Sequence, residues 1–166
     1  RHDLFLRAIA EARRDVPGLK AVIVGRDLGE EPGLRALRRE LGLEETVIFT
    51  GGIDDPAPFL KAMDVFLLTS DYEGFANVIL EAMAAGCPVA ATNVGGAREA
   101  IEHMRTGVLL PRRKPALAAR AIVRLHQHPE KREKIAEKGQ RAVEERFSFE
   151  AMVRAHAELY EELLQR

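Results

Sequence analysis

The stretch VFLLTSDYEGFANVILEAMAAG, residues 65–86, decides the fold class. Its first part, residues 65–70, is a short apolar run with β-branched and aromatic side chains, which predicts a buried strand. A turn with Gly74 follows, and residues 76–85 are apolar at all but two positions, which predicts a mostly buried helix that starts near Phe75. A buried strand that leads through a glycine turn into a buried helix is typical of α/β proteins.

Strands and helices alternate along the rest of the chain. Short apolar runs predict strands at 20–24, 47–50, 65–69, 89–92 and 107–110. Helical spacing of apolar residues predicts helices at 3–12, 34–41, 56–63, 75–85, 97–103, 115–127, 129–146 and 149–164. This alternation favours an α/β fold with a doubly wound, Rossmann-like parallel sheet covered on both faces. Such a sheet usually opens with a strand, so we expect a first strand and its loop upstream of Arg1.

Three polar side chains mark the strand–turn–helix unit as a ligand site. Asn77 and Glu81 are four residues apart and therefore share one face of the helix. Burying a lone carboxylate in an apolar helix costs several kcal/mol unless it is paired or hydrogen-bonded. Glu73 lies in the turn just upstream. The three side chains converge on the carboxyl end of a strand, where open α/β sheets bind their ligands.

The order of groups along this unit predicts a nucleotide sugar as the ligand. The N–H groups of Gly74, Phe75 and Ala76 lie at a helix N-terminus, where free donors and the helix dipole favour a phosphate. Glu81 would repel a phosphate, but its carboxylate can accept two hydrogen bonds from a ribose diol. Glu73 suits the hydroxyls of a second polyol on the other side of the phosphates. Sugar, phosphates and ribose follow one another in that order.

Size and composition fit a single domain. The chain has 166 residues, 46% hydrophobic content and a formal net charge of -1, which gives no electrostatic case for a nucleic-acid or membrane partner. Cys87 is the single cysteine and is expected to be a packed apolar residue, so no disulfide or cysteine metal centre can form within the chain. The histidines show no metal-ligand spacing, and no apolar run is long enough to span a bilayer. A reducing, cytoplasmic compartment fits this composition.

The two-glutamate unit closely resembles the donor-site motif of retaining glycosyltransferases of the GT-B fold, group 1 or family 4. The matching residues are 73–78 and 81–84, with seven residues between Glu73 and Glu81. Other segments resemble that family's C-terminal, donor-binding domain in the right order: 22–25, 47–51, 86–89, 94–96, 106–109, and 147–148 followed by a helix with Tyr160. The resemblance covers practically the whole chain, and it implies a single donor-binding domain over residues 1–166 with C-terminal helices.

The resemblance implies a role for each matched residue around the helix. Glu73 would be the catalytic residue and would contact the hydroxyls of the donor sugar. Glu81 would bind the ribose. The sugar and the phosphates of the donor would be held by Glu73 and the next four residues, Gly74, Phe75, Ala76 and Asn77.

The resemblance also places two loops and the chemistry. Gly25 would lie on a loop that faces the cleft, whereas the adjacent Arg26 and Asp27 are predicted to be ordinary loop residues, since they fit no phosphate-binding motif. Such enzymes need no metal or other cofactor, and they transfer a hexose from a nucleotide-diphosphate sugar with retention at the anomeric carbon by front-face attack. The nucleotide base would be framed by Gly51, Gly52 and Ile53.

Two departures from the family limit the expected activity. The family's phosphate-binding Arg and Lys stand in and after a first strand, upstream of the helix that begins here at His2, which leaves Arg1 as a partial remnant. The N-terminal acceptor-binding domain, the expected partner, matches no part of the chain. We therefore expect the isolated domain to bind donor weakly, since each lost charged hydrogen bond removes roughly 1.5 to 3 kcal/mol, and not to turn over. The longer protein is expected in the cytoplasm, with the membrane surface as the alternative.

Simpler structural roles stay open for the same residues. In these alternatives Glu81 pairs with an arginine such as Arg98 or is capped by nearby backbone. Glu73 is then a helix N-terminal acid that favours the dipole, and Gly95-Gly96 is an ordinary strand-to-helix turn. Two other functions also stay open. One is a non-catalytic or engineered α/β scaffold that no longer binds, and the other is a nucleotide-sugar epimerase, although the glutamate motif favours a transferase.

The last predicted helix carries apolar residues at helical spacing from Phe149 to Leu163. This pattern predicts that the helix packs on the sheet. In the resembled family the helix returns toward the other domain. The alternative for this chain is an apolar face that is exposed, swapped or used in an oligomer.

Overall fold

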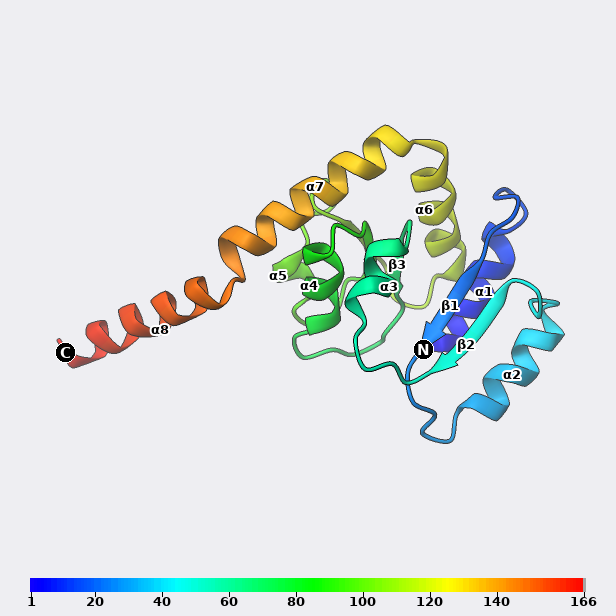
Figure 1. Cartoon of the computed structure of the whole chain (residues 1–166), viewed down its shortest axis with the longest axis horizontal. Helices are drawn as coiled ribbons and strands as arrows, with labels where there is room; N and C mark the ends of the chain where they lie inside the picture. Colours follow the sequence, from blue (N-terminus) through cyan, green and yellow to red (C-terminus); the bar gives the residue numbers. More distant parts are fainter. Residues whose placement is uncertain (166) are drawn as a thin grey trace.

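The computed structural model describes residues 1–165 and confirms an α/β fold of parallel strands and helices (Figure 1). The strands are β1 (Ala21–Val24), β2 (Val47–Gly51), β3 (Phe66–Leu68), β4 (Val89–Thr92) and β5 (Val108–Leu110). The helices are α1 (His2–Ala12), α2 (Glu31–Glu40), α3 (Ala57–Ala62), α4 (Asn77–Ala84), α5 (Ala97–Ala100), α6 (Pro115–Gln127), α7 (Pro129–Arg146) and α8 (Phe149–Leu164). Helix α5 ends earlier than predicted because Ile101 adopts an extended conformation, with φ of -109° and ψ of 120°.

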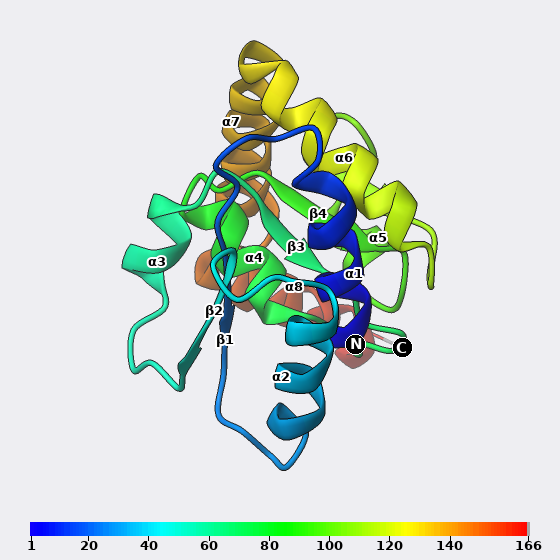
Figure 2. The same ribbon diagram turned by 90° about the vertical axis from the view of Figure 1, so that its right-hand side faces the viewer.

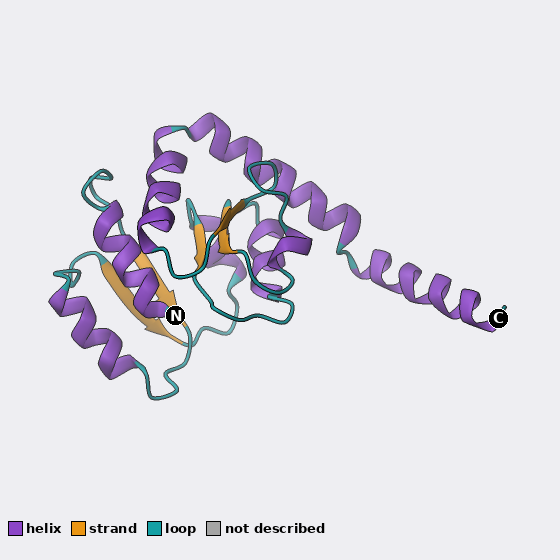
Figure 3. Ribbon diagram, turned by 180° about the vertical axis from the view of Figure 1, so that it is seen from behind, coloured by secondary structure: helices purple, strands orange, loops and turns teal. Residues whose placement is uncertain are grey.

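The strands form two parallel sheets, whereas the sequence predicted one. β1 pairs with β2, and the second sheet has the order β3-β4-β5. Figure 3 shows the two sheets as separate groups of strands. The common doubly wound order 3-2-1-4-5-6 puts its first strand between the second and the fourth. The observed order corresponds to that arrangement without this central strand, so β1 and β3 are not paired in the described part of the chain.

Helix α1 packs on α6 and joins the cores of both sheets. Leu6 and Ile9 of α1 cluster with Val47 of β2. Ala8, on the same helix, clusters with Ala90 of β4 and Val108 of β5. Because all of these side chains are buried, the apolar face of α1 holds the two sheets together.

The sheet β3-β4-β5 is covered on both faces, as predicted. Val89 and Ala91 of β4 face a cluster built from α3, α4, α5 and α7, and Ala90 between them faces α1 and α6. Figure 2 shows α1 and α6 on one side of the strands and α3 on the other. The β1-β2 sheet is covered on one face only, since Ile48 on its other face is 53% exposed.

Helix α8 extends away from the body and does not pack on a sheet (Figure 1). The prediction of a packed last helix is therefore wrong. None of its described residues is buried, and Phe149, at its start, is 71% exposed. Its N-terminus is capped by Ser148, whose hydroxyl accepts a hydrogen bond from the N–H of Ala151 at 3.2 Å. Within residues 1–165 no helix combines the length and the hydropathy needed to cross a membrane.

Candidate functional site

The polar stripe of α4 faces solvent, not the core. Ile79 and Met83 are each 1% exposed and anchor the opposite face of the helix, which leaves Asn77 and Glu81 exposed. Only the face with Ile79, Ala82 and Met83 is buried, so the prediction of a mostly buried helix is wrong for the face that carries Glu81. Within residues 1–165, the side chain of Glu81 forms no hydrogen bond or ion pair, so the alternative of a pair with Arg98 is not found. The Glu81 carboxylate is free to accept hydrogen bonds from a ligand.

The loop between β3 and α4 carries Glu73, which is half-buried and forms no ion pair or hydrogen bond in the described chain. The φ of Gly74, the next residue, is not positive. A Cβ atom added at Gly74 would have no atom within 4 Å. The space in front of this backbone is therefore open, which is what the close approach of a ligand requires.

A run of unpaired backbone donors precedes and opens α4. The helix begins at Asn77, two residues later than predicted, with Ala76 as an N-cap whose side chain makes no cap. The N–H groups of residues 75, 76, 77 and 78 have no acceptor in the part of the chain that the structure describes. Unsatisfied N–H groups and the positive end of the helix dipole favour an anion at this position.

The turn after β4, which contains Gly95 and Gly96, contacts the loop that carries Glu73. The N–H of Gly96 donates a 2.8 Å hydrogen bond to the carbonyl oxygen of Gly74. A Cβ atom on Gly96 would lie 2.5 Å from Cδ2 of Phe75, and one on Gly95 would lie 1.9 Å from the carbonyl oxygen of Glu73. The two glycines therefore do more than turn the chain, because they let two loops touch through their backbones.

An ion-paired carboxylate that the sequence analysis did not single out lies two residues before Glu73. The side chain of Asp71 is 9% exposed, and its Oδ2 accepts hydrogen bonds from Nη1 of Arg1 at 2.6 Å and from Nε of Arg113 at 3.0 Å. The guanidinium of Arg113, followed by that of Arg1, holds the pKa of Asp71 below its ordinary value. Arg1 also pairs with Asp3, so the expected remnant of a phosphate site is held by two carboxylates.

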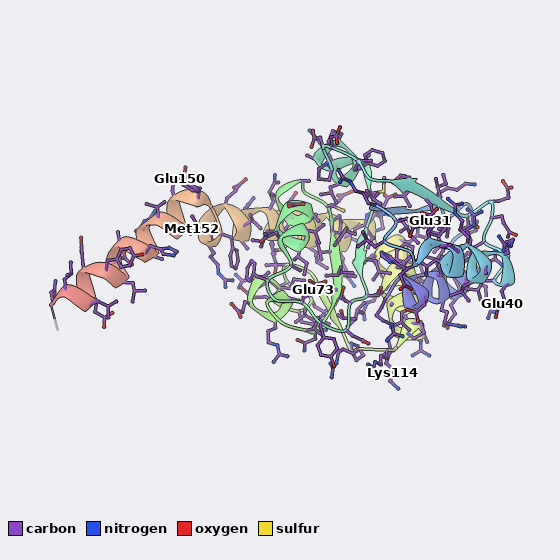
Figure 4. The ribbon with its side chains drawn as sticks, turned by 90° about the horizontal axis from the view of Figure 1, so that it is seen from below. Glu31, Glu40, Glu73, Lys114, Glu150 and Met152 are labelled. Carbon is purple, nitrogen blue, oxygen red and sulfur yellow. The ribbon has the colours of Figure 1, made fainter. Side chains whose placement is uncertain are left out.

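The loop that follows β5 reaches the same place with consecutive arginines. Arg112 donates from Nη1 to the carbonyl oxygen of Asp71 at 3.4 Å, and its guanidinium lies 5.9 Å from the ring centroid of Tyr72. Arg113 has a φ of +57°. Figure 4 labels Glu73 and Lys114 in the body of the molecule, and Glu150 and Met152 out on α8. The sequence feature that could have revealed these arginines is the basic run at residues 112–114, which follows the strand predicted at 107–110.

The loop predicted to frame the base and the predicted cleft loop with Gly25 meet at the ends of β2 and β1. The N–H of Gly25 donates to the carbonyl oxygen of Gly51 at 3.0 Å, and both residues line a hollow of about 160 Å³. Gly52 lies under Arg26, because a Cβ there would be 2.8 Å from Cγ of that arginine. Ile53 is half-buried and does not line this hollow, and neither do Glu73 and Glu81. The structure thus brings Gly25 and Gly51 together in one hollow, and Glu73 does not line that hollow.

Asp27 has a structural role, as predicted for an ordinary loop residue. Its Oδ1 accepts hydrogen bonds from the N–H of Glu31 at 3.0 Å and of Gly29 at 2.8 Å. These two bonds lower its pKa. Cys87 is buried, and burial raises the pKa of its thiol to about 11, so it is not a reactive thiolate. Among residues 1–165, no three side chains of His, Cys, Asp or Glu are grouped as metal ligands would be.

An α/β domain with free carboxylates and free amides at the carboxyl ends of its strands belongs to the open-sheet, ligand-binding class. The sequence profile of the family described as Glycosyl transferases group 1 matches residues 1–128. The chain therefore belongs to the group 1 glycosyltransferase family. This membership favours the transferase over the epimerase alternative.

Curated and solved relatives agree with this assignment. Over 151 residues the chain is 34% identical to the lipopolysaccharide core biosynthesis glycosyltransferase LpsE of Rhizobium meliloti, which covers 91% of this chain and 44% of LpsE. HepE of Anabaena, solved in complex with UDP, is 31% identical with a TM-score of 0.89 over 98% of this chain and 45% of HepE. The C-terminal domain of LpcC, a glycosyl transferase group 1 family protein from Francisella tularensis, is 30% identical with a TM-score of 0.80, over 89% of this chain and 80% of that one.

These likenesses show that the fold is that of the C-terminal domain of GT-B glycosyltransferases. The chain spans less than half the length of LpsE and of HepE.

Proposed function

We propose that this chain is the donor-binding domain of a retaining glycosyltransferase, and that it binds a nucleotide-diphosphate sugar at the start of α4. One observation carries the proposal: two unpaired carboxylates, Glu73 and Glu81, flank a run of unpaired backbone amides. The amides suit the diphosphate, and each carboxylate suits a pair of hydroxyls. Crystals of HepE contain UDP or UDP-glucose, which supports a nucleotide sugar as the ligand class.

The proposed roles follow the order of these groups. Glu73 is the catalytic residue that accepts hydrogen bonds from the donor sugar. The N–H groups from Gly74 to Val78 bind the diphosphate and stabilise its charge as it leaves, so the chemistry needs no metal. Glu81 accepts hydrogen bonds from the ribose. The base is framed by residues 51–53, with Gly25 on the neighbouring loop. Transfer with retention follows from the resemblance to family 4 enzymes.

A second domain is the proposed partner. Acceptor binding belongs to it, so residues 1–166 alone bind donor weakly and do not turn over. Other relatives of this chain include N-acetyl-alpha-D-glucosaminyl L-malate synthase of Bacillus anthracis and D-inositol 3-phosphate glycosyltransferase of Thermomonospora curvata.

Titration calorimetry with UDP, GDP, ADP and UDP-glucose tests the proposal. Glu81→Gln is expected to weaken UDP and UDP-glucose about equally, by roughly 10-fold, because hydrogen bonds to a charged group contribute about 1.5 to 3 kcal/mol. Glu73→Gln is expected to weaken UDP-glucose and to leave UDP unchanged. Glu137→Gln on the exposed face of α7 is the matched control.

A folded chain that binds none of these nucleotides would overturn the proposal and favour the non-binding scaffold. Circular dichroism of each variant shows whether a loss of binding reflects a loss of fold. Since Glu73 and Glu81 have no partner in the described chain, neither substitution should lower the stability.

A further inference from the structure

The backbone from Ser70 to Ala76 has no helix or strand to hold it. Tyr72, in its middle, is 80% exposed, and the half-buried side chain of Glu73 forms no hydrogen bond or ion pair that would fix it within the described chain. Glu81, by contrast, lies on α4, whose Ile79 and Met83 are buried in the core. The position of Glu73 therefore depends on contacts from neighbouring loops, whereas the position of Glu81 does not.

Neighbouring loops contact the loop that carries Glu73 from two sides. On one side the Gly95-Gly96 turn touches the backbone of Glu73 and Gly74. On the other side, Nε and Nη2 of Arg113 both contact Oδ2 of Asp71, at 3.0 and 2.9 Å. Arg112 donates a hydrogen bond to the backbone carbonyl oxygen of Asp71. β5 is separated from β3 by β4, so this basic loop reaches past one strand to hold the loop of another.

Two further features indicate that the arginine loop is shaped for this contact. The φ of Arg113 lies in the left-handed region, which few residues other than glycine adopt unless the surroundings impose it. The side chain of Asp71 is nearly buried, yet its Oδ1 has no hydrogen-bond partner within residues 1–165. Because Oδ1 gains no hydrogen bond from any described residue, the two arginine pairs at Oδ2 are what offsets the burial of the Asp71 carboxylate.

We propose that Asp71, held by Arg113, is a positioning residue that fixes the turn carrying Glu73 and thereby controls the affinity for the sugar part of the donor. The proposal rests on the function proposed above for Glu73. It separates two halves of one ligand: the ribose end bound by α4 is independent of Asp71, and the sugar end bound by the Glu73 loop depends on it.

Arg113→Ala, Arg113→Lys and Asp71→Asn test this, with Arg105→Ala as the matched control. The Arg113 and Arg105 side chains are 63% and 66% exposed, and each pairs with one carboxylate, but Arg105 pairs with Glu102. We expect Arg113→Ala and Asp71→Asn to weaken UDP-glucose binding by about 5- to 10-fold, which corresponds to the loss of one hydrogen-bonded contact. UDP binding should weaken by a smaller factor, because UDP lacks the sugar that Glu73 contacts and keeps its ribose contact on α4. Arg113→Lys restores part of the difference, and Arg105→Ala changes neither affinity.

A second readout needs no ligand. The N–H of Gly96 is bonded to Gly74, so its hydrogen-exchange rate reports whether the Glu73 turn stays in place. We expect faster exchange of this amide in Arg113→Ala and no change in Arg105→Ala. Equal losses of UDP and UDP-glucose affinity, or unchanged Gly96 exchange, would overturn the positioning role. If the unmodified chain binds neither compound, the proposed function fails, and the exchange rate of Gly96 still decides the role of Asp71.

Discussion

Gly95 and Glu73 touch through their backbones, because a Cβ atom at Gly95 would lie 1.9 Å from the carbonyl oxygen of Glu73. Gly95 also has a φ of +48°, which an L-residue adopts only with strain. The neighbouring loop therefore leaves no room for any side chain at this position. Gly74, one residue after Glu73, has the opposite character, with open space where its Cβ would be.

The contrast between these two glycines gives a first prediction. Gly95→Ala should lower the free energy of unfolding by about 1 to 3 kcal/mol, because the new methyl group displaces backbone. Gly74→Ala should leave stability within about 0.5 kcal/mol and weaken UDP-glucose binding, because the methyl group occupies space meant for ligand. Urea denaturation and calorimetric titration measure both effects. A stable Gly74→Ala chain with unchanged binding would place the donor elsewhere.

Substitution of alanine for glycine at two helical positions should change the free energy of unfolding in opposite directions. Gly33 in α2 has no atom within 4 Å of its Cβ position, so Gly33→Ala should stabilise the chain by about 0.5 to 1 kcal/mol through helix propensity. Gly139 in α7 is buried where a Cβ would lie 2.9 Å from the carbonyl oxygen of Thr106 and 3.6 Å from Met83. Gly139→Ala should therefore destabilise by about 1 to 3 kcal/mol despite the gain in propensity. Thermal unfolding of the two variants checks the signs, and stabilisation by Gly139→Ala would contradict the close packing of α7 on α4.

The acid dependence of stability should report on Asp71. Its pKa is lowered in the folded chain by Arg113 and Arg1, so folding favours the ionised form. The stabilisation is complete above the unfolded pKa of about 4 and is lost as the pH falls through the lower folded value. Denaturation midpoints measured from pH 6 to pH 2 should fall less steeply in Asp71→Asn. Asp64→Asn, at a side chain that is 79% exposed, should keep the slope of the unmodified chain.

Local pattern was enough to predict most of the fold. The periods of apolar residues located β4, α6, α7 and α8, because each of these segments is continuous in sequence and its buried face repeats regularly. The pairing of strands could not be read in the same way. Whether β1 pairs with β3 depends on how segments that are distant in the sequence are arranged in space. In the structure the two strands lie in different sheets.

The site shows the same division between local and distant information. Glu73, Gly74 and Glu81 form a motif within nine residues, so the sequence located them. The exposure of Glu81 was missed because it depends on which face of α4 the neighbouring helices cover. The Asp71–Arg113 pair joins residues 42 positions apart on two loops, and no local period connects them.

The exposed face of α8 gives the last prediction. Met152, Val153, Leu159 and Leu163 are about half exposed and recur at helical spacing, so the isolated 166-residue chain presents an apolar stripe to water. Leu159→Gln should reduce self-association measured by sedimentation over a range of concentrations, whereas Glu158→Gln, at the adjacent position, should not. Removing residues 149–166 should abolish association and change the stability of the body by less than about 0.5 kcal/mol, because no described residue of α8 is buried. A strictly monomeric unmodified chain at all concentrations would contradict an oligomer formed through this helix.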